Sequence, residues 1–255
     1  MEKSHREQIL DQFTRQAAPF ASSEQIRNEE ALGRIVEMAQ PSLEDTVLDV
    51  ACGPGLLACA FARVARRVSG IDLTPKMLEQ AKELQQKQGL ENLSWQEGDV
   101  QALPYRDATF SIVASRFAFH HFRDPLAVLK EMRRVCRPDG RIVIADSVPE
   151  SGKAEAFNRM EKLRDPSHVR ALSLEEFLEL FAAAGLQAPR TKRDLLPYEL
   201  EGLLRRSFPK DGDADRIREL FEESLETDSL GVVAFRENGR IRFLFPTAIF
   251  ASSVA

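Results

Sequence analysis

The feature that most constrains this chain is a strand that runs directly into a glycine turn and a helix. An apolar run at 46–50 is followed by Gly53-Pro54-Gly55 and then by an Ala- and Leu-rich stretch from Leu56 to Arg66. A strand, a tight turn and a helix in this order open a β-α-β unit. We therefore predict a parallel sheet with helices on its faces.

The same alternation continues along the chain. Further strands are predicted at 67–71, 93–97, 110–115 and 141–146. Helices are expected before the strands at 67–71, 93–97 and 141–146, and a loop marked by Pro104 before the strand at 110–115. Thr74-Pro75 and Asp124-Pro125 are typical helix starts, and Gly89 suits a left-handed helix end. The turn at 138–140 is expected to separate the helix that begins at Asp124 from the last of these strands.

Both ends of the chain are predicted to add helices to this core. In the first forty residues we expect two helices, separated near Pro19, with Ile26 on the apolar stripe of the second. After Asp146 we expect a helix from a Ser173–Glu176 capping box to Gly185, then a strand at 186–192 and a helical pair at 195–226. Asn238-Gly239 predicts a hairpin that leads into an antiparallel final strand at a sheet edge.

Bulk composition limits the class of protein. With 255 residues and 43% hydrophobic content, the chain suits one substantial domain with an appended cap. A net charge of -5 and the lack of a basic stretch argue against nucleic acid as the main partner. No apolar run approaches the roughly 20 residues of a membrane helix, and the charged N-terminus is no secretory signal.

The three cysteines point to a reducing compartment. Cys52, Cys59 and Cys136 are odd in number and lack metal-ligand spacing, so we expect free thiols, no metal and a cytoplasmic location.

Acidic residues follow three successive strands of the predicted sheet. Asp49 lies four residues before Gly53, where it would repel the phosphates of a dinucleotide. Asp72 suits a ribose diol, and Asp99 suits the exocyclic amine of a base. Ligands of open parallel sheets bind at the carboxyl ends of the strands, so these acids should line one rim. The rim fits a cationic nucleoside without phosphate, and S-adenosylmethionine is such a ligand.

At this point the sequence resembles the class I (Rossmann-like) S-adenosylmethionine-dependent methyltransferases, particularly the small-molecule group that includes the quinone-biosynthesis methyltransferases. The resemblance rests on "VLDVACGPG", "GIDLTPKMLEQA", "GDVQALPYRDATFSIV" and "LKEMRRVCRPDGRIVIAD", and it covers Leu10 to Asp146 best. It implies a doubly wound, mostly parallel seven-stranded sheet with an antiparallel edge strand. It also implies an N-terminal helical lid at 1–40, a cofactor-binding core at 41–150, and a C-terminal part with a helical substrate cap at 151–255.

The resemblance also assigns roles to residues that hold the cofactor. The methionine part would lie on the loop that contains Asp49, Ala51, Cys52, Gly53 and Gly55, with Ala51 where the family often has glycine. Asp72 would hold the ribose, Leu73 and Met77 would pack on the adenine, and Asp99 and Val100 would bracket its edge. Ser115 and Arg116 would begin the loop that faces the methionine part and the acceptor, and Phe13 and Phe20 would close over the cofactor.

If Phe13 and Phe20 do close over the cofactor, removal of residues up to Ala21 should weaken cofactor binding more than fold stability. The alternative is that both aromatic rings simply pack on the sheet.

Methyl transfer from a sulfonium needs alignment of two partners and exclusion of water, and it needs a base only if the acceptor must lose a proton. Candidate catalytic residues are His120, His121 and Arg116 after the fourth strand, with His120 favoured over His121 as a base. Arg116 could instead pair with an acid. His168 could contact substrate or cap a helix, and His5 is expected in solvent.

The acceptor is open at this stage. Phenylalanines in the cap hint at an apolar acceptor, although they could be core residues: Phe157, Phe177, Phe181, Phe208 and Phe221. Whether carbon, oxygen or nitrogen is methylated is not readable, and a monomer or homodimer is expected. Two other functions stay possible, an NAD(P)-dependent oxidoreductase and a non-catalytic protein that binds S-adenosylmethionine. Asp49 and the lack of a Tyr-x-x-x-Lys pair disfavour the first.

Overall fold

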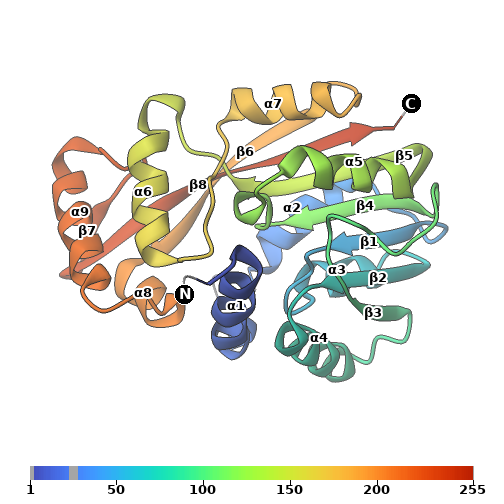
Figure 1. The fold of residues 1–255 in the computed structure, drawn as a ribbon, viewed down its shortest axis with the longest axis horizontal. Coiled ribbons are helices and arrows are strands. Elements are labelled where there is room, and N and C mark those ends of the chain that lie inside the picture. The colour runs from blue at the N-terminus through green and yellow to red at the C-terminus, as the bar shows by residue number, and fades with distance from the viewer. Residues whose placement is uncertain (1–2, 23–27, 255) are drawn as a thin grey trace.

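The computed structural model describes residues 3–22 and 28–254, and one mixed β-sheet forms its centre (Figure 1). The strands are β1 (Thr46–Val50), β2 (Arg67–Asp72), β3 (Leu93–Glu97), β4 (Phe110–Arg116), β5 (Cys136–Ser147), β6 (Arg190–Glu199), β7 (Phe235–Glu237) and β8 (Arg240–Ser253). The helices are α1 (His5–Ser22), α2 (Glu29–Ala39), α3 (Leu56–Ala62), α4 (Pro75–Gln88), α5 (Pro125–Val135), α6 (Ala154–Arg164), α7 (Leu174–Ala183), α8 (Leu200–Ser207) and α9 (Asp213–Thr227). The described residues also contain two short 3-10 helices, at Phe119–His121 and Ser151–Lys153.

The strand order confirms the predicted fold class. The sheet runs β3-β2-β1-β4-β5-β8-β6, and β7 pairs with β8 outside this path. The first five strands are parallel, whereas β8 is antiparallel to both β5 and β6. The order reverses at β1, which has β2 on one side and β4 on the other. Ligands of such sheets bind at this reversal, outside the carboxyl ends of the strands.

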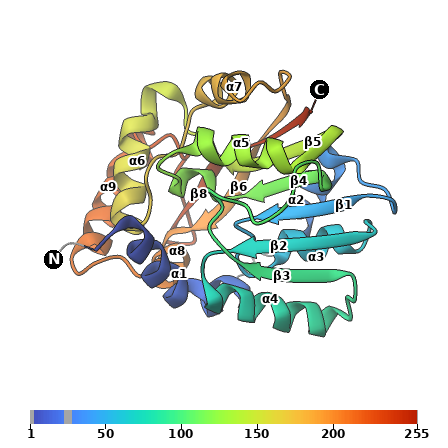
Figure 2. The ribbon, with the colours of Figure 1, turned by 45° about the vertical axis from the view of Figure 1, so that its right-hand side comes forward.

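Two apolar layers cover the faces of the sheet. Helices α5 and α7 pack on one face through residues such as Leu129, Met132 and Phe177. Helices α2 and α3 pack on the other through Leu32, Ile35 and Phe61. Figure 2 shows α5 and α7 running along the same side of the sheet. Burial of these faces fixes the strand ends that carry the site.

A third apolar cluster builds the cap. It joins α6, α8 and α9 to the far ends of β6 and β8, with Phe157, Phe221 and Phe243 fully buried at its centre. In Figure 1 the cap lies at the left of the sheet, and α1 lies between α8 and α4. The N-terminal helix therefore bridges the cap and the core. A division of roles among residues 1–40, 41–150 and 151–255 stays a prediction.

Several predicted elements have different limits in the structure. Helix α1 continues through Pro19 to Ser22, because a proline removes one N–H without having to end a helix. The strand predicted at 186–192 lies at Arg190–Glu199, so the helical pair begins at Leu200. Pro197 lies within this strand and is tolerated because β6 is an edge strand. The predicted turn at 138–140 lies within β5, and Ile26 lies outside the described residues.

Other local predictions agree with the structure. Ser173 and Glu176 form the expected capping box, and Asp124 caps α5. Gly89 adopts the left-handed conformation after α4. Asn238 and Gly239 both have positive φ, 51° and 75°, as a tight hairpin turn requires. The final strand β8 is antiparallel as predicted, but its expected place at the sheet edge was wrong, because β6 pairs on its outer side.

Candidate functional site

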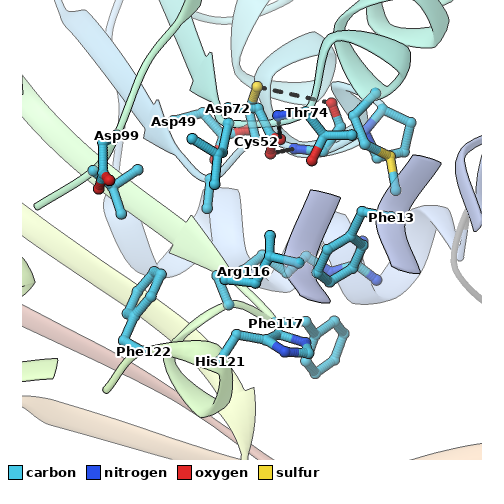
Figure 3. A pocket seen from close by; sticks show the side chains of 18 of the residues that line it. Phe13, Asp49, Cys52, Asp72, Thr74, Asp99, Arg116, Phe117, His121 and Phe122 are labelled. Carbon is cyan, nitrogen blue, oxygen red and sulfur yellow. Dashed lines mark hydrogen bonds between the residues drawn. The ribbon is translucent and has the colours of Figure 1, made fainter. Parts of the chain in front are cut away.

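A cavity of about 400 Å³ lies at the carboxyl ends of the parallel strands, beneath α1. Most residues predicted to bind the cofactor line it: Phe13, Phe20, Asp49, Ala51, Cys52, Gly53, Asp72, Leu73, Met77, Asp99, Val100 and Arg116. Figure 3 shows Asp49, Cys52, Asp72 and Thr74 along one side, with Phe117, His121 and Phe122 across from them. The cavity is therefore acidic on the side of β1 and β2 and largely aromatic on the side of the loop after β4.

Asp49 is a buried carboxylate that the protein leaves partly unsatisfied. It is 1% exposed, and its Oδ2 atom has no hydrogen-bond partner among the residues that the structure describes. Burial raises the pKa of Asp49 to about 8, a backbone hydrogen bond from Ala58 opposes this shift, and the charge of Asp72 adds to it. An unpaired buried carboxylate is costly, so its position at a ligand cavity indicates a cationic or hydrogen-bonding ligand.

The turn after Asp49 has an unusual backbone. Ala51, Gly53 and Gly55 all have positive φ, 54°, 52° and 77°. A side chain at Gly55 would lie 2.6 Å from the ring of Trp95, so only glycine fits this position. Gly55 faces Trp95 and does not line the cavity, whereas Ala51 and Gly53 do. In the predicted loop, Ala51 and Gly53 therefore face the ligand space, whereas Gly55 allows Trp95 to pack closely behind the loop.

Asp72 is held by the backbone on both sides. Its Oδ2 accepts the N–H of Gly53 at 2.8 Å, and its Oδ1 accepts the N–H of Thr74 at 2.8 Å. Burial raises the pKa of Asp72, and these two donors oppose the shift. Thr74 lines the cavity and does not cap α4 with its side chain. Its buried Oγ1 has no hydrogen-bond partner among the described residues. Asp72 therefore fixes the glycine turn while its carboxylate still borders the ligand space.

Asp99 is more exposed than the other two acids. Its Oδ1 accepts the N–H of Gln101 at 3.0 Å, and its Oδ2 forms an ion pair with Arg6 of α1 at 3.1 Å. His5 also reaches the site, since its Nε2 lies 2.8 Å from the carbonyl oxygen of His121. The expectation that His5 lies in solvent was wrong. The first turn of α1 is thus tied to two different walls of the cavity.

The end of β4 divides into structural and cavity-facing residues. The Ser115 hydroxyl is fully buried and donates to the carbonyl of Val50 at 2.8 Å, which ties β4 to β1. Arg116 lines the cavity, and its guanidinium carbon lies 4.8 Å from the centroid of the Phe117 ring. Phe117 has a φ of 53°, so the chain turns sharply into the histidine segment here. Ser115 therefore anchors the loop whose next two residues, Arg116 and Phe117, line the ligand space.

Of the two adjacent histidines, only His121 lines the cavity. His120 points away, with its Nδ1 atom 2.5 Å from Oδ1 of Asp146. Burial alone would lower the pKa of His120, but the charge of Asp146 and the hydrogen bond to it raise the value. His168 is fully buried, and its Nε2 lies 2.7 Å from Oδ1 of Asn158. The structure therefore favours His121 over His120 as the histidine that meets an acceptor.

Aromatic residues of the cap belong mainly to the core. Phe157, Phe177, Phe181 and Phe221 are almost fully buried, Phe208 is 36% exposed, and none of them lines the cavity. The aromatic lining comes instead from Phe13, Phe20, Phe117 and Phe122. Phe117 and Phe122 were not singled out from the sequence, although both flank the histidine pair. Their position next to a strand end was the available signal.

Comparisons with known proteins give the family. The methyltransferase domain family matches residues 48–144. YcgJ of Bacillus subtilis, an uncharacterized methyltransferase, is 32% identical over 231 residues, which are 89% of this chain and 91% of YcgJ. Its crystal structure matches with a TM-score of 0.81, at 30% identity, over 88% of this chain and 98% of that chain. The structure of BH2331 from Bacillus halodurans matches with a TM-score of 0.80 and 26% identity over the same shares.

The strand order and the acids around the glycine turn define the class as a Rossmann-like methyltransferase. The chain belongs to the methyltransferase family that includes YcgJ, and S-adenosylmethionine is the cofactor of this class. In the described ranges, no helix is long and apolar enough to cross a membrane. Within those same ranges, no group of three or more metal-binding side chains is arranged to hold an ion.

Proposed function

We propose that this enzyme transfers the methyl group of S-adenosylmethionine to a small-molecule acceptor bound in the same cavity. The observation that carries the proposal is the buried Asp49 carboxylate at the edge of the ligand space, whose Oδ2 has no partner within the described part of the chain. A positively charged ligand would satisfy this oxygen, whereas the phosphates of a dinucleotide would be repelled by it.

The lining residues fit the parts of this cofactor. Asp49 and the turn at 51–53 would hold the charged methionine part, and Asp72 would accept the ribose hydroxyls. Leu73, Met77 and Val100 offer an apolar slot for the adenine, with Asp99 at its rim. Phe13 and Phe20 of α1 would cover the bound nucleoside. When bound, S-adenosylmethionine supplies an electrophilic methyl carbon on a sulfonium.

The acceptor would occupy the side of the cavity formed by the loop after β4. Phe117, Phe122 and His121 line this side, together with Arg116 and Arg123. A volume of about 400 Å³ is in the range of small-molecule pockets, roughly 300–1,000 Å³. Enclosure by α1 would exclude water and hold the acceptor in line with the methyl carbon, which is the main requirement of this displacement.

The family argues against the oxidoreductase alternative, and two titrations would separate the possibilities. We expect S-adenosylhomocysteine to bind with micromolar or tighter affinity in calorimetry and NADH not to bind. Trp95, the single tryptophan, packs against Gly55 of the turn, so its fluorescence should change on binding. Binding of NADH with no response to S-adenosylhomocysteine would overturn the proposal.

A screen of small acceptors with radiolabelled methyl donor then tests catalysis. Transfer of label to any hydroxyl, amine or carbon acid would support the proposal, and binding of donor without transfer to any of a broad set would favour the non-catalytic alternative. Demethylmenaquinone methyltransferase of Deinococcus radiodurans is 42% identical over 107 residues, 40% of this chain and 43% of that enzyme. Quinone precursors therefore belong in the first set of acceptors.

The remaining expectations concern location and partners. We propose a cytoplasmic enzyme, a monomer or homodimer, that acts on a free small molecule and not on nucleic acid. Cys52, Cys59 and Cys136 are free and buried, which fits a reducing compartment.

A further inference from the structure

The hydrogen bonds of His121 determine which of its ring nitrogens carries the proton. Its Nδ1 lies 3.1 Å from the carbonyl oxygen of Ser167 and 3.2 Å from the hydroxyl oxygen of the same residue. A carbonyl oxygen can only accept a hydrogen bond. Nδ1 must therefore carry the proton.

Ser167 is itself oriented by a buried aspartate. Its hydroxyl donates to Oδ1 of Asp165 at 2.5 Å, and its backbone N–H donates to the same oxygen at 2.9 Å. The hydroxyl proton is therefore used, and Oγ can offer His121 only a lone pair. Asp165 and Ser167 are 1% and 0% exposed. Both atoms that face Nδ1 are thus held as acceptors by a segment that water does not reach.

With Nδ1 protonated, a neutral His121 has its free lone pair on Nε2. Among the residues that the structure describes, Nε2 has no hydrogen-bond partner, and the ring lines the cavity. Phe13 of α1 packs edge-on against the ring at 5.0 Å between centroids. The ring is thus fixed from two sides, by Ser167 and by α1.

The surroundings keep this ring neutral. Burial lowers the pKa of His121 to about 3, the charge of His120 lowers it further, and Asp165 opposes both. Arg164 also acts to lower the value, and His168 lies on another side with ring centroids 6.3 Å apart. His121 therefore presents a lone pair at any physiological pH.

We propose that Asp165 and Ser167 are positioning residues that hold His121 in the Nδ1–H tautomer, so that Nε2 takes the proton of a protic acceptor during methylation. The inference rests on the proposed function and names its substrate class, a hydroxyl compound whose oxygen carries both the proton and the new methyl group. The acceptor atom bonds to the methyl carbon, the carbon–sulfur bond breaks with its electron pair left on sulfur, and the acceptor proton joins Nε2. The positive charge passes from sulfonium to imidazolium, and the ring returns its proton to water after product release.

A weak base is sufficient for this step with a hydroxyl acceptor. A hydroxyl oxygen that gains a methyl group becomes an oxonium, which is a far stronger acid than an imidazolium of pKa about 3. The proton is therefore transferred downhill as the new bond forms. His120 cannot take this role because its Nδ1 is bound to Asp146 and its ring does not line the cavity.

Histidine tautomers can be read directly by nitrogen NMR on the full-length protein labelled with ¹⁵N-histidine. The chain has four histidines, so single His→Gln variants assign the signals. We expect His121 to show the Nδ1–H pattern with and without S-adenosylhomocysteine. Asp165→Asn should shift it toward Nε2–H, whereas Ser167→Ala should keep the Nδ1–H pattern because the carbonyl of residue 167 still accepts from Nδ1. An Nε2–H pattern for His121 in the unaltered protein would overturn the inference without any activity measurement.

A kinetic experiment with a protic acceptor from the screen distinguishes this inference from the proposed function. We expect His121→Gln to lower kcat by about 100-fold or more, with S-adenosylhomocysteine affinity within about threefold, and Asp165→Asn to lower kcat by about 10-fold. His168→Gln is the matched control, because it removes a neighbouring buried imidazole that does not line the cavity. Full rates in His121→Gln would reject the inference and leave the methyltransferase proposal intact, whereas failure to bind S-adenosylhomocysteine would reject both.

Discussion

Asp49 and Asp72 face the same cavity from adjacent strands, but the protein satisfies only Asp72. Both oxygens of Asp72 accept backbone N–H groups at 2.8 Å, whereas Oδ2 of Asp49 has no partner in residues 3–22 and 28–254. The charge of Asp72 also disfavours ionisation of Asp49, and part of the raised pKa of Asp49 has this cause. A cation between them would relieve both effects. The arrangement of Asp49 and Asp72 in the ligand-free protein thus favours the binding of a positively charged ligand.

Replacement of this carboxylate should stabilise the protein while it weakens cofactor binding. The pKa of Asp49 is about 8 in the folded state and near its ordinary value when unfolded, so the folded state holds the extra proton between these values. Stability is therefore lost as the pH rises from about 4 to about 8. We expect Asp49→Asn to be more stable than the unaltered protein in urea unfolding at pH 8, with the gain shrinking toward pH 4. Its S-adenosylhomocysteine affinity should fall by about 10-fold or more.

A carboxylate with the opposite shift provides the control. Hydrogen bonds from Ser111, Ser42 and Arg141 outweigh burial and lower the pKa of Asp45. Asp45→Asn should therefore lose stability at pH 8, and the loss should shrink as the pH falls below the ordinary aspartate pKa. If Asp49→Asn also lost stability at pH 8, the conclusion that the ionised Asp49 side chain destabilises the folded protein would be wrong.

The sheet and its acids could be predicted from sequence because each signal is local. Asp49 precedes its own glycine turn, and Asp72 ends a strand whose next residues begin a helix. Alternating strands and helices bring such strand ends together without further information. The prediction was weaker where a local signal was ambiguous. The segment at 195–199 was predicted as helical but belongs to β6, which contains Pro197; a proline is allowed there because β6 lies at the sheet edge, which the local sequence does not show.

The histidine cluster could not be derived in this way, because its contacts join distant segments. His121 meets Ser167 across 46 positions, and His5 meets the carbonyl of His121 across 116. Which of two adjacent histidines faces a cavity depends on the short turn at 119–121 and on Asp146, which holds His120 away. Asp146 lies at the end of a strand, as Asp49 does, so the position of this acid could be predicted from the sequence. Its pairing with His120 could not.

The close contact of Trp95 with two glycines predicts a packing effect of defined sign. A side chain at Gly70 would lie 2.5 Å from the Trp95 ring and 2.9 Å from Sγ of Cys52. We expect Gly70→Ala to cost about 1–3 kcal/mol of unfolding free energy and to change the tryptophan emission. Smaller residues at position 95, as in Gly70→Ala combined with Trp95→Leu, should recover part of the cost.

A glycine with open space is the matched control for this substitution. Gly33 lies inside α2, and beyond its chain neighbours and its own helix backbone no atom of the described residues lies within 4 Å of an added Cβ. Gly33→Ala should therefore raise stability by about 0.5–1 kcal/mol, since alanine favours a helix over glycine. If Gly70→Ala and Gly33→Ala changed the unfolding free energy equally, contact with Trp95 would not be the reason that position 70 requires glycine.

The buried ion pair between His120 and Asp146 should give stability a defined pH dependence. Asp146 raises the folded-state pKa of His120 above its ordinary value, so the contribution is complete below pH 6.5 and is lost as the pH rises through the raised value. Asp146 also accepts the N–H groups of Ala118 and Phe119. We expect Asp146→Asn to lose about 3–5 kcal/mol at pH 6, with a smaller loss at pH 9.

His120→Gln isolates the titrating part of this effect. It keeps the Asp146 carboxylate on its backbone donors, so its urea-unfolding profile between pH 6 and pH 9 should be flatter than that of the unaltered protein. An unchanged slope would assign the pH dependence to groups other than this pair.

Phe13 connects α1 to the cavity, and its removal should affect binding more than folding. Its ring packs on His121 at 5.0 Å and on Phe20 at 6.4 Å between centroids. A truncation up to Ala21 would also remove the buried Gln12 and its hydrogen bond to the Ser207 carbonyl, so a point substitution is the sharper test. We expect Phe13→Ala to weaken S-adenosylhomocysteine binding by about 10-fold and to cost about 1 kcal/mol of stability, because the ring is only half-buried.

Arg15→Ala, an exposed position on the same helix, should leave both the binding free energy measured by calorimetry and the unfolding free energy within about 0.5 kcal/mol of the unaltered protein. Equal affinity in Phe13→Ala and Arg15→Ala would mean that α1 covers the cavity without contacting the cofactor.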